Sequence, residues 1–289
     1  MLEKVADEGG FKGAGKLSPD GKKLAISEGD PQNDITVLDL NTGTKTRLTF
    51  GGATHLMPAW SPDGKSVVYI KQTRATLVTG TTVCMRQANG GGQEKVIVGT
   101  GNPGEATYQE PQISGDGRYL LYLQQSGPSD AAIWAMPLSG DQKPLAVVKP
   151  QNAQTRIVHY SMSPDGEWLA YTSTESGREE VYVTHFPSGE GRWQVSQTSG
   201  TSPLWRADGK EIYYAGLQDA IFHAVSVVPS GEDFEVGQAQ AMFPINIVAP
   251  LGTPYDPAPD GQRFILATYP ESVSAPLVLV TNWSAGVNK

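Results

Sequence analysis

Cysteine is nearly absent from this sequence: Cys84 is the only one in 289 residues. A single cysteine excludes an internal disulfide and a zinc site built on cysteine ligands. No apolar run approaches the roughly 18 residues of a membrane span, so we expect no membrane insertion by this chain. The acidic start, MLEKVADEGG, lacks the apolar stretch that follows the charged segment of a signal peptide. These absences leave the cellular compartment open.

Positive charge and catalytic motifs are also scarce. Lys and Arg number 22 against 30 Asp and Glu, and no run of basic residues stands out. Nucleic-acid binding needs clustered positive charge, so we expect no nucleic-acid partner. The sequence contains no G-x-S-x-G, P-loop, H-E-x-x-H, or G-x-G-x-x-G opening a helix. We therefore expect that the chain is not an enzyme.

What the sequence does contain is a repeat. A Pro-Asp-Gly turn or a close variant, followed by an alternating apolar strand, occurs six times, with its aspartate at Asp20, Asp63, Asp116, Asp165, Asp208 and Asp260. The successive spacings are 43, 53, 49, 43 and 52 residues. A period of about 40–50 residues is typical of repeat architectures, and propeller blades are those built only from strands. Asp-Gly between extended runs indicates a two-residue hairpin in which both residues take positive φ.

Each repeat reads as four strands, which predicts an all-β fold: a six-bladed β-propeller of four-stranded antiparallel blades, forming one domain over 1–289. The blades are expected at approximately 10–50, 52–99, 105–148, 155–197, 200–244, and 250–289 plus 2–6. The sixth repeat lacks a fourth strand, while Leu2 to Ala6 precedes the first turn without a partner. Because a closed ring removes exposed strand edges, we expect Leu2 to Ala6 to form the outer strand of the last blade.

The repeat register also indicates where a site would lie. The third residue before each turn aspartate is apolar, including Trp60 and Trp205, and is expected to pack between blades. The sixth residue before each aspartate is Ala14, Met57, Glu110, His159, Ser202 or Pro254. Glu110 and His159 are therefore equivalent positions in adjacent blades, expected to face one another at the channel mouth.

A carboxylate beside an imidazole is able to hold a cation, completed by His55 or water, or to shuttle protons. The alternative is a solvated ion pair around a water-filled channel. Neighbouring residues give the mouth the aromatic and polar character of a surface that binds a peptide or small ligand: Tyr108, Gln109, Arg156, Tyr160 and Tyr255. Tyr160 and Tyr255 occupy the position that is proline in other repeats, so the alternative is that they replace that proline in packing.

One acidic loop, SEGDPQND, carries Glu28, Asp30 and Asp34. Crowded carboxylates suit calcium, but the spacing is not that of an EF-hand, and a solvated turn is the alternative. We expect no cofactor, with a bound calcium or other divalent cation left open. Glu110 and His159 are the candidates for metal ligands.

The repeats resemble the WD-like repeats of TolB-family six-bladed β-propellers. The closest stretch runs from Ser163 to Tyr214 and includes SPDGEWLAYTSTESGREEVYV and GTSPLWRADGKEIYY. It is similar to the carboxy-terminal propellers of bacterial membrane-linked serine/threonine kinases. No kinase motif occurs in this chain. The resemblance implies a bacterial, non-catalytic sensor or interaction domain, periplasmic or otherwise extracytoplasmic, with an upstream kinase or membrane-anchored domain as a candidate partner.

The first hypothesis is therefore a module that binds a protein, peptide or small molecule at the channel mouth, since loops on a rigid scaffold often carry binding. The second is a metal-assisted polysaccharide lyase or hydrolase using Glu110, His159 and His55, because some TolB-like propellers resemble oligogalacturonate lyases. The third is a purely structural partner of a neighbouring domain.

Overall fold

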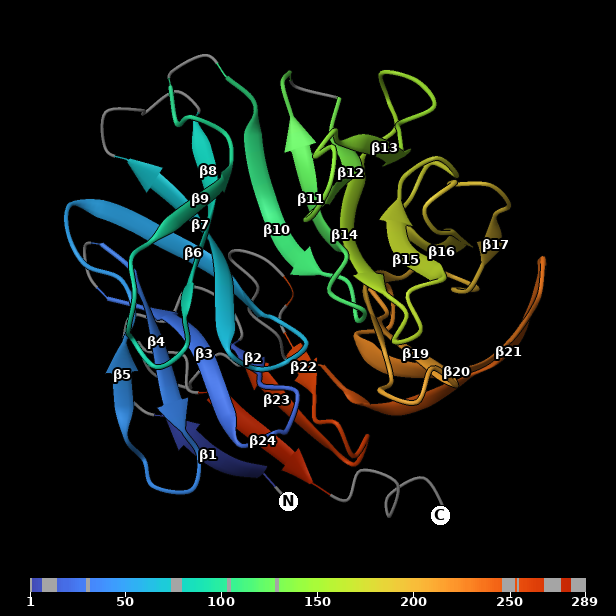
Figure 1. The fold of residues 1–289 in the computed structure, drawn as a ribbon. Helices are drawn as coiled ribbons and strands as arrows, with labels where there is room; N and C mark the ends of the chain where they lie inside the picture. Colours follow the sequence, from blue (N-terminus) through green and yellow to red (C-terminus); the bar gives the residue numbers. More distant parts are fainter. Residues whose placement is uncertain are drawn as a thin grey trace.

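The regular elements of the described chain are strands. The structure is a computed structural model that describes residues 2–6, 15–29, 32–73, 80–102, 105–127, 130–245, 253, 255–267 and 277–281. For 2–6 and 277–281 it describes the backbone alone. The strands of this part of the chain form six four-stranded antiparallel sheets. Figure 1 shows the sheets arranged around a common axis, with the first strand of each repeat innermost. None of the described residues forms a helix that is long and apolar enough to cross a membrane. The prediction of an all-β propeller with six blades is confirmed.

The first three blades follow the chain without a crossover. Their strands are β2 Lys16–Leu17, β3 Lys23–Glu28, β4 Asp34–Asp39 and β5 Lys45–Arg47; β6 Ala53–Trp60, β7 Ser66–Thr73, β8 Thr81–Gln87 and β9 Lys95–Val98; and β10 Thr107–Ile113, β11 Tyr119–Gln125, β12 Ala132–Pro137 and β13 Leu145–Val148.

The fourth and fifth blades repeat this order, and the sixth is completed from the other end of the chain. Their strands are β14 Ile157–Met162, β15 Trp168–Ser173, β16 Glu180–His185 and β17 Trp193–Gln194; β18 Thr201–Trp205, β19 Glu211–Ala215, β20 Ile221–Ser230 and β21 Asp233–Pro244; and β22 Tyr255–Pro257, β23 Arg263–Ala267, β24 Leu277–Thr281 and β1 Leu2–Ala6. The assignment of all 289 residues to one domain stays a prediction.

The ring closes as predicted, with Leu2–Ala6 as the outer strand of the last blade. In the sixth sheet the order is β1-β24-β23-β22, so β1 is its outer strand. β1 and β24 are antiparallel, with Leu2 opposite Val280 and Lys4 opposite Val278. In Figure 1 the two strands, dark blue and red, lie side by side. The strand pairing thus joins opposite ends of the sequence in one blade.

The Pro-Asp-Gly turns differ from the expected two-residue hairpin. In the fourth blade only Gly166 has a positive φ, 76°, whereas Asp165 does not. The Gly166 N–H donates to the Ser163 carbonyl (3.0 Å), and the Ser163 N–H donates to the Trp168 carbonyl (2.8 Å). This is a type I turn followed by a left-handed glycine. The prediction that both Asp and Gly take positive φ was wrong, because the preceding proline fixes a negative φ that suits a type I turn.

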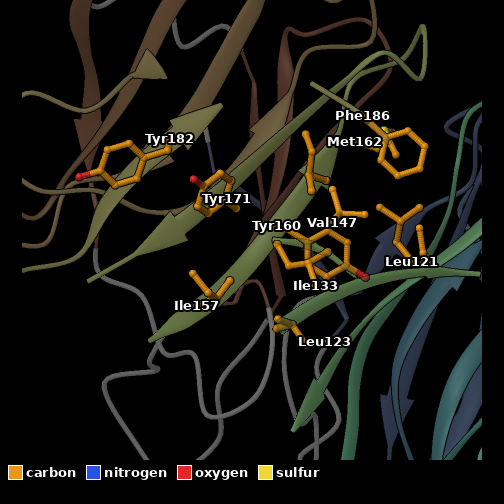
Figure 2. Close-up of a cluster of buried hydrophobic side chains, with 12 residues drawn as sticks. Leu121, Leu123, Ile133, Val147, Ile157, Tyr160, Met162, Tyr171, Tyr182 and Phe186 are labelled. Atoms are coloured by element: carbon orange, nitrogen blue, oxygen red, sulfur yellow. The ribbon is translucent and has the colours of Figure 1, made fainter. Parts of the chain in front are cut away.

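The hydrophobic core is divided among the interfaces between blades. Six clusters of buried side chains correspond to the six pairs of adjacent blades, including the pair formed by the first and the last. Figure 2 shows the cluster between the third and fourth blades, which includes Leu121 and Ile133 from the third and Ile157 and Met162 from the fourth. In the last interface Leu24 and Ile26 meet Ile265. Each blade is therefore stabilised by burying both of its faces against neighbours.

Candidate functional site

A channel runs along the axis of the ring and is lined mainly by the innermost strands. It contains a cavity of about 310 Å³ with wall residues from all six blades. A second cavity, about 360 Å³, lies toward the Pro-Asp-Gly turns and shares Leu17, Trp60, Met162 and Trp205 with the first. The two cavities therefore adjoin, and the second lies toward the face that carries the turns.

The innermost strands of four blades are bulged at the position singled out by the repeat register. Met57, Glu110, His159 and Ser202 have φ values of 53°, 50°, 44° and 55°, and the strand pairing shifts at the same points. Positive φ is uncommon for residues other than glycine and is maintained only by the surrounding structure. The equivalent Ala14 and Pro254 lie outside the described residues. The sequence carries no glycine here that would have indicated this conformation.

Glu110 and His159 contact one another across the interface of the third and fourth blades, as expected. The Glu110 carboxylate and the His159 Nδ1 form an ion pair or hydrogen bond, with 13% and 24% of the two side chains exposed. Burial lowers the pKa of the imidazole, but the charge of the Glu110 carboxylate, its hydrogen bond and the more distant Glu179 together outweigh burial, so the pKa lies above its ordinary value. Glu110 lines the central cavity directly.

His55 does not join this pair. Its side chain is 1% exposed, its Nδ1 lies 3.1 Å from the Asp34 carboxylate, and its ring contacts the edge or face of Tyr69 at 5.6 Å between centroids. Burial lowers the pKa of His55 despite the nearby Asp34. His55 is therefore part of the interface between the first and second blades, which sequence reasoning could not distinguish from the channel mouth.

The two described carboxylates of the acidic loop have partners within the protein. Glu28 pairs with Lys45 at 3.0 Å, and Asp34 pairs with Arg47 as well as His55. Asp30 lies outside the described residues. No group of three or more His, Cys, Asp or Glu side chains suited to a metal occurs in the described part of the chain.

Tyr160 and Tyr255 lie between blades, and each donates a hydrogen bond to the bulged residue of the preceding blade. The Tyr160 hydroxyl donates to the Glu110 carbonyl of the preceding blade. The Tyr255 hydroxyl donates to the Ser202 carbonyl at 2.6 Å, with a second acceptor, the Tyr213 carbonyl, at 3.0 Å. Both side chains are buried, at 5% and 0% exposure. Figure 2 shows Tyr160 within the cluster rather than apart from it, so both tyrosines have the packing role that their equivalence to proline suggested.

Replacing Tyr255 by Phe should lower the free energy of unfolding by about 1–2 kcal/mol, because two buried carbonyl groups lose their shared donor. Urea unfolding followed by far-ultraviolet circular dichroism measures this loss. Tyr119→Phe is the control, since Tyr119 is only half-buried, and should change stability by less than about 0.5 kcal/mol. Equal losses in both variants would contradict the role assigned to the Tyr255 hydroxyl.

The other predicted mouth residues are spread around Glu110 and His159. Tyr108 is half-buried against Tyr122, with 5.5 Å between ring centroids, and burial raises its pKa. Gln109 is exposed. Arg156 has 64% of its side chain exposed and faces Glu179 at 3.9 Å. These three therefore lie outside the wall of the central cavity, whereas Glu110 and Tyr160 form part of it.

Sequence reasoning missed a second charged pair in the channel. Lys16 Nζ lies 2.9 Å from Asp256, whose other oxygen accepts the Leu17 N–H at 2.8 Å. Both charged residues line the cavity and join the first blade to the sixth. Each is the fourth residue before a turn aspartate. Comparing that position between repeats, as was done for the sixth residue, would have found them.

Trp60 and Trp205 contribute aromatic wall to both cavities. Their indole N–H groups donate to carbonyls of the preceding blade, Lys16 at 2.7 Å and Ser161 at 3.1 Å. The two side chains are 8% and 6% exposed. They pack between blades as expected, and they also present fixed apolar surface to the channel.

Comparisons with known proteins agree with this architecture. An uncharacterized protein of Agrobacterium fabrum is 27% identical over 123 residues, which are 42% of this chain and 39% of that protein. The crystal structure of TolB from Acinetobacter baumannii superposes with a TM-score of 0.61 and 18% identity, covering 93% of this chain and 63% of TolB. An oligogalacturonate lyase in complex with manganese has a TM-score of 0.61 and 15% identity, covering 97% and 93%. At these identities the two structures show the fold alone.

The chain spans less than two thirds of the length of the first two of these proteins. The family model of the TolB beta propeller domain matches residues 1–155, more than half of the sequence. The six closed blades and this match lead to the same conclusion: the chain belongs to the TolB beta propeller domain family.

Proposed function

We propose that the chain is a non-catalytic binding or interaction module whose ligand or partner enters the central channel. The observation that supports this is the channel wall, which comes from all six blades and is mainly apolar, with a few charged residues. A concave, mostly apolar surface with few well-placed polar groups is typical of binding sites. We also propose, from the family resemblance, an extracytoplasmic location and a protein or peptide as the first class of partner to test.

The wall is held in place by contacts between blades, which suits a preformed site. The Tyr160 hydroxyl, the Trp205 indole and the Asp256 carboxylate each bond to backbone groups of an adjacent blade. A site that is rigid before binding loses less entropy when its ligand arrives. The support for binding is therefore geometric: a mainly apolar channel whose wall is already fixed.

A channel-filling variant tests the proposal. Ala59 lines the cavity, so Ala59→Phe should occupy part of it. Peptides selected from a random display library, and hits from a small-molecule library, should bind the wild-type protein and lose roughly tenfold or more in affinity for this variant. Val96→Phe is the matched control, because Val96 is 51% exposed on β9. Ligands that bind both variants equally, or a complete lack of ligands, would overturn the proposal.

The alternative is a metal-assisted polysaccharide lyase or hydrolase. It is supported by the likeness to a manganese-bound oligogalacturonate lyase and by the contact between Glu110 and His159. Equilibrium dialysis against Mn²⁺ tests for the metal. With oligogalacturonate as substrate, ultraviolet detection of unsaturated product tests for a lyase, and an assay of new reducing ends without unsaturation tests for a hydrolase. Stoichiometric metal that is lost in the double variant Glu110→Ala and His159→Ala, with product formed by the wild type, would favour the enzyme. If the protein binds no metal and no ligand that depends on the channel, a purely structural domain is favoured.

A further inference from the structure

The charged residues in the wall of the central cavity are Lys16, Glu110 and Asp256. Lys16 and Asp256 satisfy one another at 2.9 Å, and Asp256 is held further by the Leu17 N–H. Glu110 instead has the His159 imidazole as its partner. An imidazole carries a positive charge only when protonated, so Glu110 is the carboxylate of this wall whose counter-charge is removable.

The surface around Glu110 is apolar and aromatic. Trp60, Tyr160 and Trp205 line the same cavity, and their polar atoms are already engaged by backbone carbonyls. The aromatic wall therefore has no free indole or phenol donor to offer an anion. A cation is attracted both to a carboxylate and to aromatic faces, and its apolar body would be buried against the remaining wall.

On this basis we propose that the channel binds a small free amine, a primary ammonium on an aromatic or branched aliphatic body, with Glu110 as its counter-ion. The inference rests on the proposed binding function and specifies the chemistry of its ligand. A cavity of about 310 Å³ accommodates a body of roughly ten heavy atoms. Where His159 is protonated, the ammonium replaces the imidazolium as the partner of Glu110, and binding then releases a proton from His159.

The other charges near His159 leave this exchange intact. Glu179 favours the protonated imidazole and Lys16 opposes it, but both act more weakly than Glu110. Lys16 is itself paired with Asp256, and Glu179 faces the exposed Arg156 at 3.9 Å. Tyr160 stays neutral, because burial raises its pKa well above its ordinary value. At low pH the imidazolium neutralises Glu110, and above the raised pKa of His159 the carboxylate is open to an external cation.

The test is isothermal titration calorimetry of the full chain with 2-phenylethylamine, using 2-phenylethanol as the neutral analogue. An aliphatic amine keeps its proton up to roughly pH 10. At about pH 8.5 the amine should bind roughly tenfold or more tightly than the alcohol, as expected for a hydrogen bond to a charged group. Glu110→Gln should remove this preference. Glu190→Gln, which changes an exposed carboxylate outside the channel, should leave it unchanged.

His159 provides a second readout that loss of structure would not reproduce. Between about pH 8.5 and pH 5.5 the wild-type affinity for the amine should fall roughly tenfold, because His159 becomes protonated. His159→Gln, which keeps a hydrogen-bonding side chain without a titratable charge, should bind the amine with equal affinity at both pH values. Quenching of tryptophan fluorescence should accompany binding, since Trp60 and Trp205 line the cavity.

Equal affinity for the amine and the alcohol, or an amine preference that survives Glu110→Gln, would overturn this inference. Binding of a peptide through its amino terminus, with no binding of the free amine, would also overturn the inference, because the occupant would then be a polypeptide. If the library ligands blocked by Ala59→Phe carry no ammonium group, the proposed binding function stands while the amine inference fails. If no ligand depends on the channel, both fail.

Discussion

Deleting residues 1–9 should open the ring at its last blade. β1 pairs with β24 from Leu2 opposite Val280 to Ala6 opposite Leu277, so its removal leaves β24 as an unpaired edge. Amides of β24 that point toward β1 lose their acceptors, and the remaining ladder to β23 becomes the outermost pair of the sheet. Hydrogen exchange in Leu277–Thr281 should therefore become about 100-fold faster or more, and the midpoint of urea unfolding should fall.

The fourth blade provides an internal control for this deletion. Amides of β15, Trp168–Ser173, lie in a different sheet and should keep most of their protection. Adding a synthetic peptide of residues 1–9 should restore protection in β24, because the paired edge can be refilled in trans. Unchanged exchange in Leu277–Thr281 after the deletion would mean that β1 does not close the ring.

Replacing Trp168 by Ala should lower the free energy of unfolding by about 3–5 kcal/mol, the usual loss for a large aromatic side chain removed from a core. Trp168 is 1% exposed. Its ring lies 4.1 Å from that of His185 and 4.9 Å from that of Phe234, measured between centroids. Phe234 belongs to the fifth blade, so the substitution leaves a cavity between two blades rather than within one.

Two comparisons make this expectation specific. Trp168→Phe, which keeps an aromatic ring, should lose only about half as much stability. Phe50→Ala removes a ring that is 60% exposed and should change the free energy by less than about 1 kcal/mol. Because Trp205 lies in the same cluster as Trp168 and also lines the channel, amine binding should weaken in Trp168→Ala. A loss below about 1 kcal/mol would contradict the importance of this interface.

The fold was predictable because its signals are local. A turn with proline and glycine at set positions, such as Pro164 and Gly166, stops one strand and starts the next whatever surrounds it. Alternating apolar residues after the turn suit a strand whose two faces are both buried against other blades. The place of β1 also followed from counting strands, because the sixth repeat lacked a fourth strand and Leu2 to Ala6 belonged to no other repeat.

The site was predictable only in part, and its residues show why. Glu110 and His159 could be paired because equivalent positions of adjacent repeats must lie side by side in a ring. His55 lies two residues before the bulged position Met57 in its own blade, yet its side chain is buried against Asp34. Strand alternation and the bulge together decide which side of the strand a residue occupies, and a bulge at a residue other than glycine leaves no mark in the sequence.

The sequence by itself determined the number of blades, the turn between the first two strands of each blade, and the strand that closes the ring. These depend on the φ preferences of proline and glycine and on short-range alternation, which act within a few residues. Tertiary structure alone decided that the Tyr255 hydroxyl donates to the Ser202 carbonyl, and that Glu110 rather than His55 lines the channel. Those contacts join residues from different blades, so they exist only once the ring has closed and each blade has its neighbour in place.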